Sequence, residues 1–394
     1  MKRSPFVFAL LGLAIVGCGA ASQSQSTTAR LLEETRIVAQ RDAAGGYRFD
    51  TYTAEDLFRQ GTTLQADGHC SDAVARYDRI ADEFASSRYL SPSLYNAALC
   101  LQQTGQLTAS AAHYYQLVDH LPDSEDAKVA RLQLAGVLVT LERWEEALAS
   151  ADLLLARTDL QSDERLEAMA RRAQALFGMR RLEQATQAAD DAGVYYRTRR
   201  GDEVITDPYF AAAAMFVRAE AIRARSETMV LPPTEVETQH EILEQRAQLL
   251  LDAQRAYFDT IRLTNAHWAA AAGFRIGSMY ETLYADLTGA PVPPPAEVMN
   301  DQQLALYQDA YRAELRHRVE PLVRHAIRYW ELTLLMVERT QTDESQWVQR
   351  TRAELDRARA MLETGALPRQ DRASALGDPR GGGAAPDGMP AAAP

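Results

Sequence analysis

The spacing of histidines gives a first indication of the chemistry open to this chain. Seven histidines lie at positions 69, 113, 120, 240, 267, 317 and 325. His240-Glu241 begins the H-E-x-x-H string of zinc proteases, but position 244 is Glu where a second histidine ligand is required. No two histidines have the helical spacing of a metal-binding pair, so the sequence predicts no metal site.

Motifs for cofactor and nucleophile chemistry are also missing from the sequence. It contains no phosphate loop, no dinucleotide fingerprint and no G-x-S-x-G elbow. The acidic residues are spread over expected helix surfaces, where pairs such as Glu145-Glu146 are typical of a solvated face. We therefore expect no enzyme, no cofactor and no small-molecule substrate. An enzyme within the segment 194–364 is the alternative.

Cys18 stands where covalent lipid attachment is expected. Two basic residues precede an apolar stretch from Phe6 to Val16, and this pattern predicts a secretory signal peptide over residues 1–17. The stretch that ends in Gly17-Cys18 resembles the bacterial lipobox, which implies a lipidated Cys18. Because Gly19 replaces the Asp of inner-membrane retention, the resemblance further implies an outer-membrane protein facing the periplasm. An uncut membrane anchor is the alternative, but a span needs about 20 apolar residues.

Polar segments flank the central part of the chain. Residues 18–53 are rich in Ser, Gln, Thr, Ala and Gly, and they predict a flexible tether. Residues 365–394 are mostly Ala, Gly, Pro, Asp and Arg, and they predict a disordered tail. The net charge of −12 argues against a nucleic-acid partner, because nucleic acids are bound by clustered cations.

A repeat of 37 to 38 residues organises the segment 54–193. One small residue recurs on the first expected helix of each unit (Gly61, Ala98, Ala135, Ala173) and another on the second (Ala73, Ser110, Ala147, Ala185). A leucine follows three positions after each first-helix residue (Leu64, Leu101, Leu138, Leu176). Antiparallel helices approach closely only where side chains are small, so the pattern predicts four helical hairpins. A bundle of alanine-rich helices is the alternative.

The repeat loosens beyond residue 193. Residues 194–290 are expected to form irregular fifth and sixth hairpins, with Gly277 at a helix crossing. A proline-rich break opens the segment 291–364, whose capping helices are expected to cover the end of the array. We expect one helix to end near residue 319 and the next to begin at Pro321, which fits a first turn.

These features resemble the tetratricopeptide repeat, and the layout is similar to tetratricopeptide lipoproteins of bacterial envelopes, of a deltaproteobacterial or myxobacterial type. Such lipoproteins include components of barrel assembly, pilotins and gliding-motility proteins. The resemblance implies an all-α fold, a right-handed tetratricopeptide-like α-solenoid with capping helices, and a role as a non-enzymatic scaffold in an envelope assembly. The alternatives are a pilotin or regulator of a peptidoglycan enzyme and, more remotely, a peptidoglycan-modifying enzyme.

The resemblance also implies a binding face, because first helices line the concave side of such arrays. Carried onto this sequence, the face would bind an envelope protein or peptide through Glu55, Phe58, Gln65, Tyr95, Leu99, Gln102, Gln103, Leu132, Val139, Glu167, Gln174 and Phe177. Burial of its aromatic residues by the superhelix itself is the alternative. The arginines at 171, 172, 180, 181, 197, 199 and 200 are expected on a solvated convex surface, with a dock for an acidic partner or lipid headgroups as the alternative.

Cys70 and Cys100 are expected to lie close together. Cys70 opens the second helix of the first hairpin, and Cys100 lies near the end of the next helix, which is its antiparallel neighbour. In an oxidising compartment this placement predicts a disulfide between the first two hairpins. Two buried thiols that pack as small apolar groups are the alternative.

Overall fold

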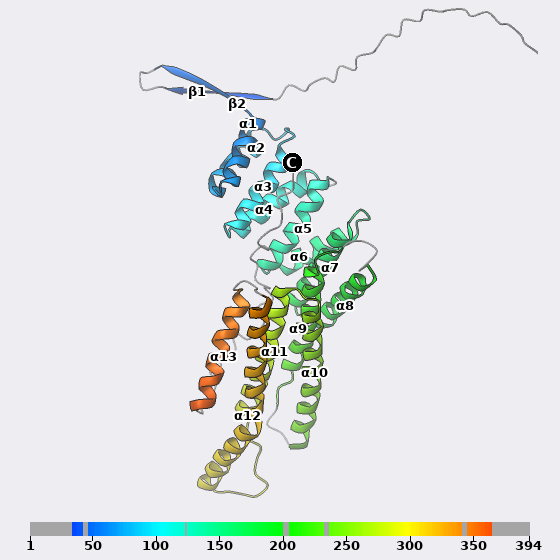
Figure 1. Ribbon diagram of the computed structural model, residues 1–394, viewed down its shortest axis with the longest axis vertical. Coiled ribbons are helices and arrows are strands. Elements are labelled where there is room, and N and C mark those ends of the chain that lie inside the picture. Colours follow the sequence, from blue (N-terminus) through cyan, green and yellow to red (C-terminus); the bar gives the residue numbers. More distant parts are fainter. Residues whose placement is uncertain are drawn as a thin grey trace, which may run out of the picture. The chain divides into compact units, whose positions relative to one another are not determined.

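The computed structural model describes residues 34–41, 46–122, 124–199, 205–231, 236–340 and 345–364. Within them the chain forms 13 helices and a two-stranded sheet (Figure 1). The chain divides into two units, residues 1–53 and 54–394. The predicted signal peptide, Cys18, Arg200 and the predicted tail lie outside the described residues.

A β-hairpin occupies the described part of the first unit. Strands β1 (Thr35–Arg41) and β2 (Tyr47–Thr53) pair antiparallel, with Thr35 opposite Thr53 and Arg41 opposite Tyr47. This corrects the expectation of a flexible tether for the two strands, while residues 18–33 of the predicted tether lie outside the described residues. The averaged composition of that segment concealed a short stretch of β-branched and aromatic residues, which favour extended backbone.

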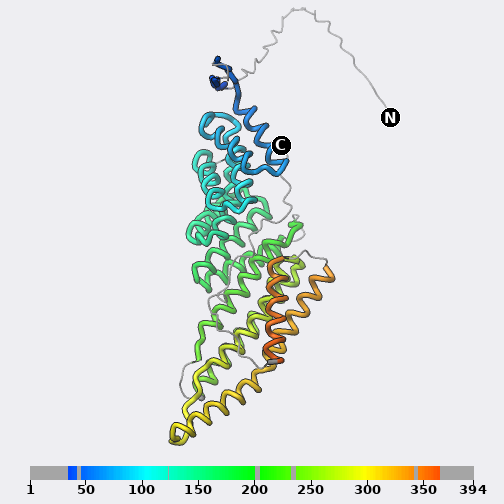
Figure 2. Tube along the Cα trace, turned by 90° about the vertical axis from the view of Figure 1, so that its left-hand side faces the viewer, coloured from blue at the N-terminus to red at the C-terminus, as the bar shows by residue number. Residues whose placement is uncertain are grey.

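Helices make up the described part of the second unit. Four hairpins pair α1 (Ala54–Ala66) with α2 (Cys70–Glu83), α3 (Leu90–Gln103) with α4 (Leu107–His120), α5 (Glu125–Thr140) with α6 (Trp144–Leu155), and α7 (Ser162–Gly178) with α8 (Leu182–Arg199). Longer helices follow, namely α9 (Tyr209–Glu227), α10 (Val236–Arg262), α11 (Ala266–Gly289), α12 (Asp301–Thr340) and α13 (Gln346–Thr364). Each helix packs on the next along the chain (Figure 2), so the predicted all-α solenoid is confirmed.

The small residues of the repeat lie where the two helices of each hairpin cross. All eight are buried. In the second hairpin the Ser110 hydroxyl donates to the carbonyl of Ala98 at 2.8 Å, which joins the two crossing positions directly. In the first hairpin a Cβ at Gly61 would lie 2.6 Å from the Tyr77 ring. The predicted burial of the small residues is therefore confirmed in all four hairpins, and their close approach in the first two.

The turn inside each of these four hairpins has one hydrogen-bond pattern. The turn residue has a positive φ in every case: 80° at Gly68, 76° at Gly105, 61° at Glu142 and 60° at Arg180. The next amide donates, at 2.8 to 3.0 Å, to the carbonyl of the recurring leucine at 64, 101, 138 or 176. This is a Schellman motif, which satisfies carbonyls that would otherwise be left at the helix end. Glu142 and Arg180 therefore form the same turn in the third and fourth hairpins, although neither is glycine.

The later helices continue the same packing. Helices α9 and α10 form the fifth hairpin, α11 and α12 the sixth, and α13 packs on α11 and α12. A Cβ at Gly277 of α11 would lie 2.2 Å from Nε1 of Trp330, and that nitrogen donates to the carbonyl of Phe274 at 3.0 Å. Gly277 and Trp330 therefore repeat the arrangement of Gly61 and Tyr77.

Pro321 lies inside a helix, which corrects the expectation that it begins one. Helix α12 runs without interruption from Asp301 to Thr340. Proline cannot donate to the carbonyl four residues earlier, here that of His317, and this loss usually ends or kinks a helix. His317 and Arg318 are exposed and Arg316 is half-buried, so water can reach this part of the helix.

Gly277→Ala is expected to lower the free energy of unfolding by about 1–3 kcal/mol, the range for overpacking a core. The added methyl group would overlap an indole that is held in place by its own hydrogen bond. Urea unfolding followed by circular dichroism measures the effect. Thr282→Ala, at a half-buried position of the same helix, is the matched control. Equal stability of the two variants would contradict the close crossing.

His113 is expected to make stability depend on pH. Its Nε2 lies 2.8 Å from Asp78 Oδ1, and this hydrogen bond raises the pKa of His113 above 6.5, with burial acting against it. The contact joins α4 to α2, so its contribution is present below pH 6.5 and is lost as the pH rises through the raised pKa.

Urea unfolding of the native chain and of His113→Gln over this pH range tests the linkage. The difference in unfolding free energy between the two should shrink as the pH rises. A difference that grows with pH would show that the neutral imidazole is the stabilising form.

Candidate functional site

The inner surface of the array is identified by which helices touch. Consecutive first helices contact each other in the pairs α3–α5, α5–α7, α7–α9, α9–α11 and α11–α13. Consecutive second helices such as α4 and α6 are not among the closely contacting pairs of the described helices. The first helices therefore lie on the concave side, as the resemblance implies.

The inner surface is open on α1 and α3. Tyr95, Leu99 and Gln102 lie three or four positions apart on α3, so they share one face, and all three are half-buried. On α1, Phe58 and Gln65 are half-buried and Glu55 is exposed. These predicted binding residues are brought together on two neighbouring hairpins, with Gln103 exposed at the end of α3.

Tyrosines of the second helices orient the glutamines of the open surface. Tyr77 donates through its hydroxyl to Gln65 Oε1 at 2.8 Å, and Tyr114 donates to Gln102 Oε1 at 3.4 Å. The second pair lies 37 residues after the first, which is one repeat, so the first two hairpins have the same contact. Because each amide oxygen accepts from a tyrosine, the amide nitrogen is the group that remains to donate to a ligand.

Aromatic rings pack beside these glutamines. The Phe58 ring centroid lies 6.0 Å from that of Tyr77 and 5.2 Å from that of Tyr89, and Tyr95 meets Tyr114 edge-on at 5.9 Å. Burial raises the pKa of Tyr95, and the carboxylates of Glu167 and Asp126 raise it further. The open surface is thus an apolar, aromatic strip that presents amide donors.

Further along the array the inner surface is closed. Five predicted binding residues are buried, namely Leu132, Val139, Glu167, Gln174 and Phe177. This corrects their assignment to a free concave face, and for Phe177 the alternative of burial by the superhelix holds. Because α7 contacts both α5 and α9, the inward side chains of these helices pack between helices instead of facing solvent. Leu132, for example, packs with Leu154 and Ala168.

Arg171 belongs to this closed part, which corrects its assignment to a solvated convex surface. Its side chain is 20% exposed and pairs with Glu167 at 3.3 Å. Its guanidinium approaches Gly136 of α5 so closely that a Cβ there would lie 2.9 Å away, and it lies 5.2 Å from the Phe210 ring centroid of α9. Burial raises the pKa of Glu167, although Arg171 lowers it. One arginine therefore bridges three first helices.

The other predicted arginines remain near solvent. Arg172 pairs with Asp152 at 2.8 Å, and Arg180, Arg181, Arg197 and Arg199 are exposed. Arg172 and Asp152 line a hollow of about 390 Å³ between α6, α7 and α8. In the same hollow Arg165 donates to the carbonyls of Leu155 and Arg157. Its cations are thus already partnered, which disfavours a dock for an acidic ligand there.

Cys70 and Cys100 are free, buried thiols, so the structure has the alternative arrangement in place of the predicted disulfide. Both belong to one apolar cluster with Ala73, Tyr77 and Ala97. The Cys70 thiol donates to Gln103 Oε1 at 3.4 Å, and burial raises the pKa of the Cys100 thiol. A raised pKa keeps the thiol protonated and therefore poorly reactive.

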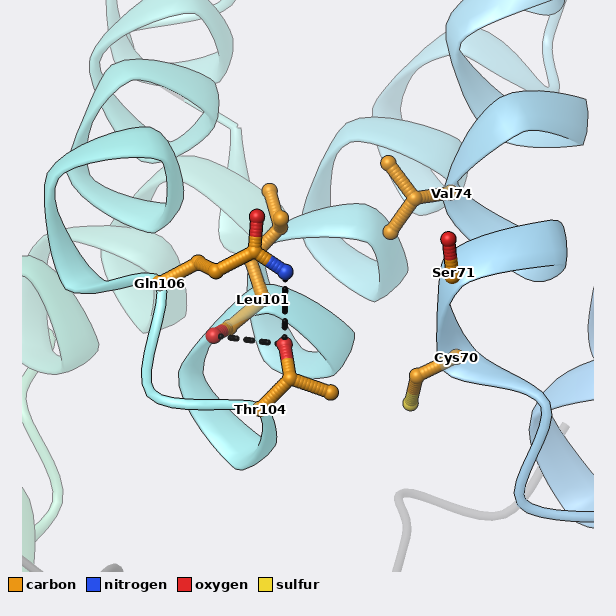
Figure 3. A pocket seen from close by; sticks show the side chains of 6 residues that line it. All are labelled: Cys70, Ser71, Val74, Leu101, Thr104 and Gln106. Atoms are coloured by element: carbon orange, nitrogen blue, oxygen red, sulfur yellow. Dashed lines mark hydrogen bonds between the residues drawn. The ribbon is translucent and has the colours of Figure 1, made fainter.

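The cavity beside Cys70 is small. It measures about 80 Å³ and is lined by Cys70, Ser71, Val74, Leu101, Thr104 and Gln106 (Figure 3). Thr104 donates to the carbonyl of Leu101 at 3.2 Å and accepts from Gln106 at 3.1 Å, so its polar groups already have partners. A space of this size holds a few water molecules.

A buried charge cluster in the fifth and sixth hairpins was not anticipated from the sequence. Glu220 pairs with Arg223 at 2.9 Å and with Arg275 at 3.2 Å, and the Tyr257 hydroxyl donates to it. Burial acts to raise the pKa of Glu220, but the two guanidinium groups hold it below its usual value. The cluster is closed to solvent, so it serves packing. The sequence did contain a signal for this cluster, because Glu220 and Arg223 lie within an alanine-rich helix.

Among the described residues, no helix combines the length and apolarity that crossing a membrane requires. The same residues contain no group of three or more histidine, cysteine, aspartate or glutamate side chains that could hold a metal ion.

Residues 50–153 match the family model of the tetratricopeptide repeat-like domain. The matched range covers α1 to α6, which include the open inner surface. No curated protein sequence matches the chain significantly. A tetratricopeptide-like fold is typical of non-enzymatic scaffolds for protein–protein interaction, and this chain contains such a repeat domain.

Solved structures with similar chains include two bacterial proteins. A tetratricopeptide repeat protein from Parabacteroides merdae ATCC 43184 is 12% identical and aligns over 77% of this chain and 98% of its own, with a TM-score of 0.37. MamA from Desulfovibrio magneticus RS-1, from position 41 to its end, is 14% identical over 50% of this chain and 94% of its own, with a TM-score of 0.35. These scores describe a general likeness only.

A chain that begins after Cys18 is expected to react with maleimide at both remaining cysteines, but only once unfolded. In the folded chain both thiols are buried. Mass spectrometry under non-reducing conditions, with and without urea, measures the adducts. Cys100→Ser should then leave one reactive thiol in urea. An unfolded chain that resists labelling until it is reduced would restore the disulfide.

Proposed function

We propose that this protein is a periplasmic scaffold that a lipid on Cys18 anchors to the outer membrane. Its concave face would bind a segment of an envelope protein and so hold an envelope assembly together. The anchor is supported by the basic, apolar and small residues before Cys18. The binding role is supported by the open strip on α1 and α3, where two oriented glutamines stand one repeat apart among aromatic rings.

The chemistry of the strip favours a neutral, apolar segment as partner. Its amide nitrogens suit acceptors such as main-chain carbonyls, and its rings suit apolar side chains. Arg171, in the closed part of the inner surface, is already paired with Glu167, so it is no free cation for a terminal carboxylate. A pilotin or a regulator of a peptidoglycan enzyme would use the same surface. The identity of the bound segment distinguishes these roles.

A photocrosslinking amino acid at Leu99 is expected to capture the partner in the native envelope. Leu99 lies in the open strip, whereas Gln116 is exposed on the second helix α4 and provides the matched control. Gln102→Leu keeps the size of the side chain but removes the amide donor, so it should weaken capture from Leu99. Gel shift and mass spectrometry of the adduct measure the result.

Equal capture from both positions, or capture that Gln102→Leu leaves unchanged, would contradict binding at the strip. Cys18→Ser provides a further arm. It should move the protein from the membrane fraction to the soluble periplasmic fraction. A variant that stays in the membrane fraction would contradict the lipid anchor.

A further inference from the structure

The β-hairpin has one apolar face that is exposed. Residues paired across the two strands share a face, so one face carries Thr35, Ile37, Ala39, Arg41, Tyr47, Phe49, Thr51 and Thr53. Ile37 is 68% exposed, and Tyr47 and Phe49 are each 67% exposed. Large apolar side chains gathered in this way mark an interaction surface.

The charges of the hairpin are gathered on its other face. That face carries Arg36, Val38, Gln40, Arg48, Asp50 and Tyr52. Arg48 pairs with Asp50 at 2.9 Å, and Arg36 pairs with Glu34 at 3.1 Å. Of the residues on the apolar face only Arg41 is charged, so this face holds no carboxylate although the whole chain has a net charge of −12.

A two-stranded hairpin with an exposed apolar face is expected to pack that face against another surface. An isolated two-stranded sheet is marginally stable in water. With strands of seven residues, the apolar face is about 23 Å long, and the two strands together present roughly 230 Å². A stable interface between two proteins buries about 800 Å² on each side. A second copy of the hairpin is therefore too small a partner.

We propose that the apolar face of the hairpin lies on the membrane surface, with Ile37, Tyr47 and Phe49 at the level of the lipid headgroups and upper acyl chains. This inference rests on the proposed lipid anchor at Cys18. Thr35 follows Cys18 by 17 residues, and 17 residues span at most about 60 Å even when fully extended. The anchor keeps the hairpin near the bilayer, so a small apolar face is sufficient.

The side chains match the chemistry of an anionic bilayer surface. Tyrosine is enriched at membrane interfaces, where its ring is apolar and its hydroxyl is hydrated. The guanidinium of Arg41, at the turn end of the apolar face, suits lipid phosphates. The carboxylate of Asp50 points from the opposite face and pairs with Arg48, which limits repulsion from the same lipids.

Phe49→Trp in the lipidated full-length protein tests this placement. The protein is reconstituted in vesicles of phosphatidylethanolamine and phosphatidylglycerol whose acyl chains carry bromine, which quenches tryptophan fluorescence on contact. After the fluorescence of the unsubstituted protein is subtracted, the emission of Phe49→Trp should be blue-shifted. The brominated acyl chains should quench it. The matched control Tyr52→Trp places the reporter on the opposite face of the same strand, where quenching should be absent.

A second arm separates this inference from the anchor. A polyhistidine tag that replaces Cys18 attaches each variant to the same vesicles through a nickel-chelating lipid, and mass spectrometry reports whether native Cys18 carries acyl chains. An unmodified Cys18 would refute the anchor, while quenching of Phe49→Trp on the nickel lipid would still support the membrane contact.

Equal fluorescence of Phe49→Trp with and without bromine in both arms would overturn the inference. Protection of that tryptophan from an aqueous quencher without quenching by bromine would also overturn it, since a protein or a second copy would then cover the face.

Discussion

Close approach of paired helices at small residues is the constraint on which the array depends. Gly61 leaves the space that Tyr77 fills, and Gly277 leaves the space that Trp330 fills, far along the chain. In the second hairpin the Ser110 hydroxyl bonds the carbonyl at the opposite crossing. Because each crossing fixes the distance between two helices, it also fixes the surface on which the next hairpin packs. Leucines and tyrosines can then recur at one spacing and meet the same neighbours.

The inner surface has two parts, one closed by contacts between first helices and one open on α1 and α3. Where α5, α7 and α9 touch, inward side chains become core, and Arg171 with Glu167 closes the seam between them. On α1 and α3 the corresponding positions remain partly exposed, and Tyr77 and Tyr114 hold the glutamines in place. The same repeat therefore forms a closed part and the open strip, according to how closely the first helices approach.

The sequence predicted the features that follow from spacing. Gly61, Ala98, Ala135 and Ala173 located the crossings because a period of small residues is visible without a structure. It did not predict which inward residues are buried, since burial of Phe177 depends on the approach of another helix. It also missed the pairing of Glu220 with Arg275, which are distant in the chain. The hairpin was missed because a mainly polar segment surrounds its few apolar residues.

The buried apolar clusters differ in size along the array. One continuous core runs from α7 to α13 and includes three buried tryptophans, whereas Cys70, Ala73, Tyr77, Ala97 and Cys100 form a separate small cluster under α1 to α3. Regions with few buried apolar contacts open at a lower free energy than the rest of a protein. Most of the second hairpin belongs to a larger cluster that it shares with α5. The first hairpin is thus the segment that opens most readily. A ligand that engages it would order it on binding, and the affinity would be coupled to local folding.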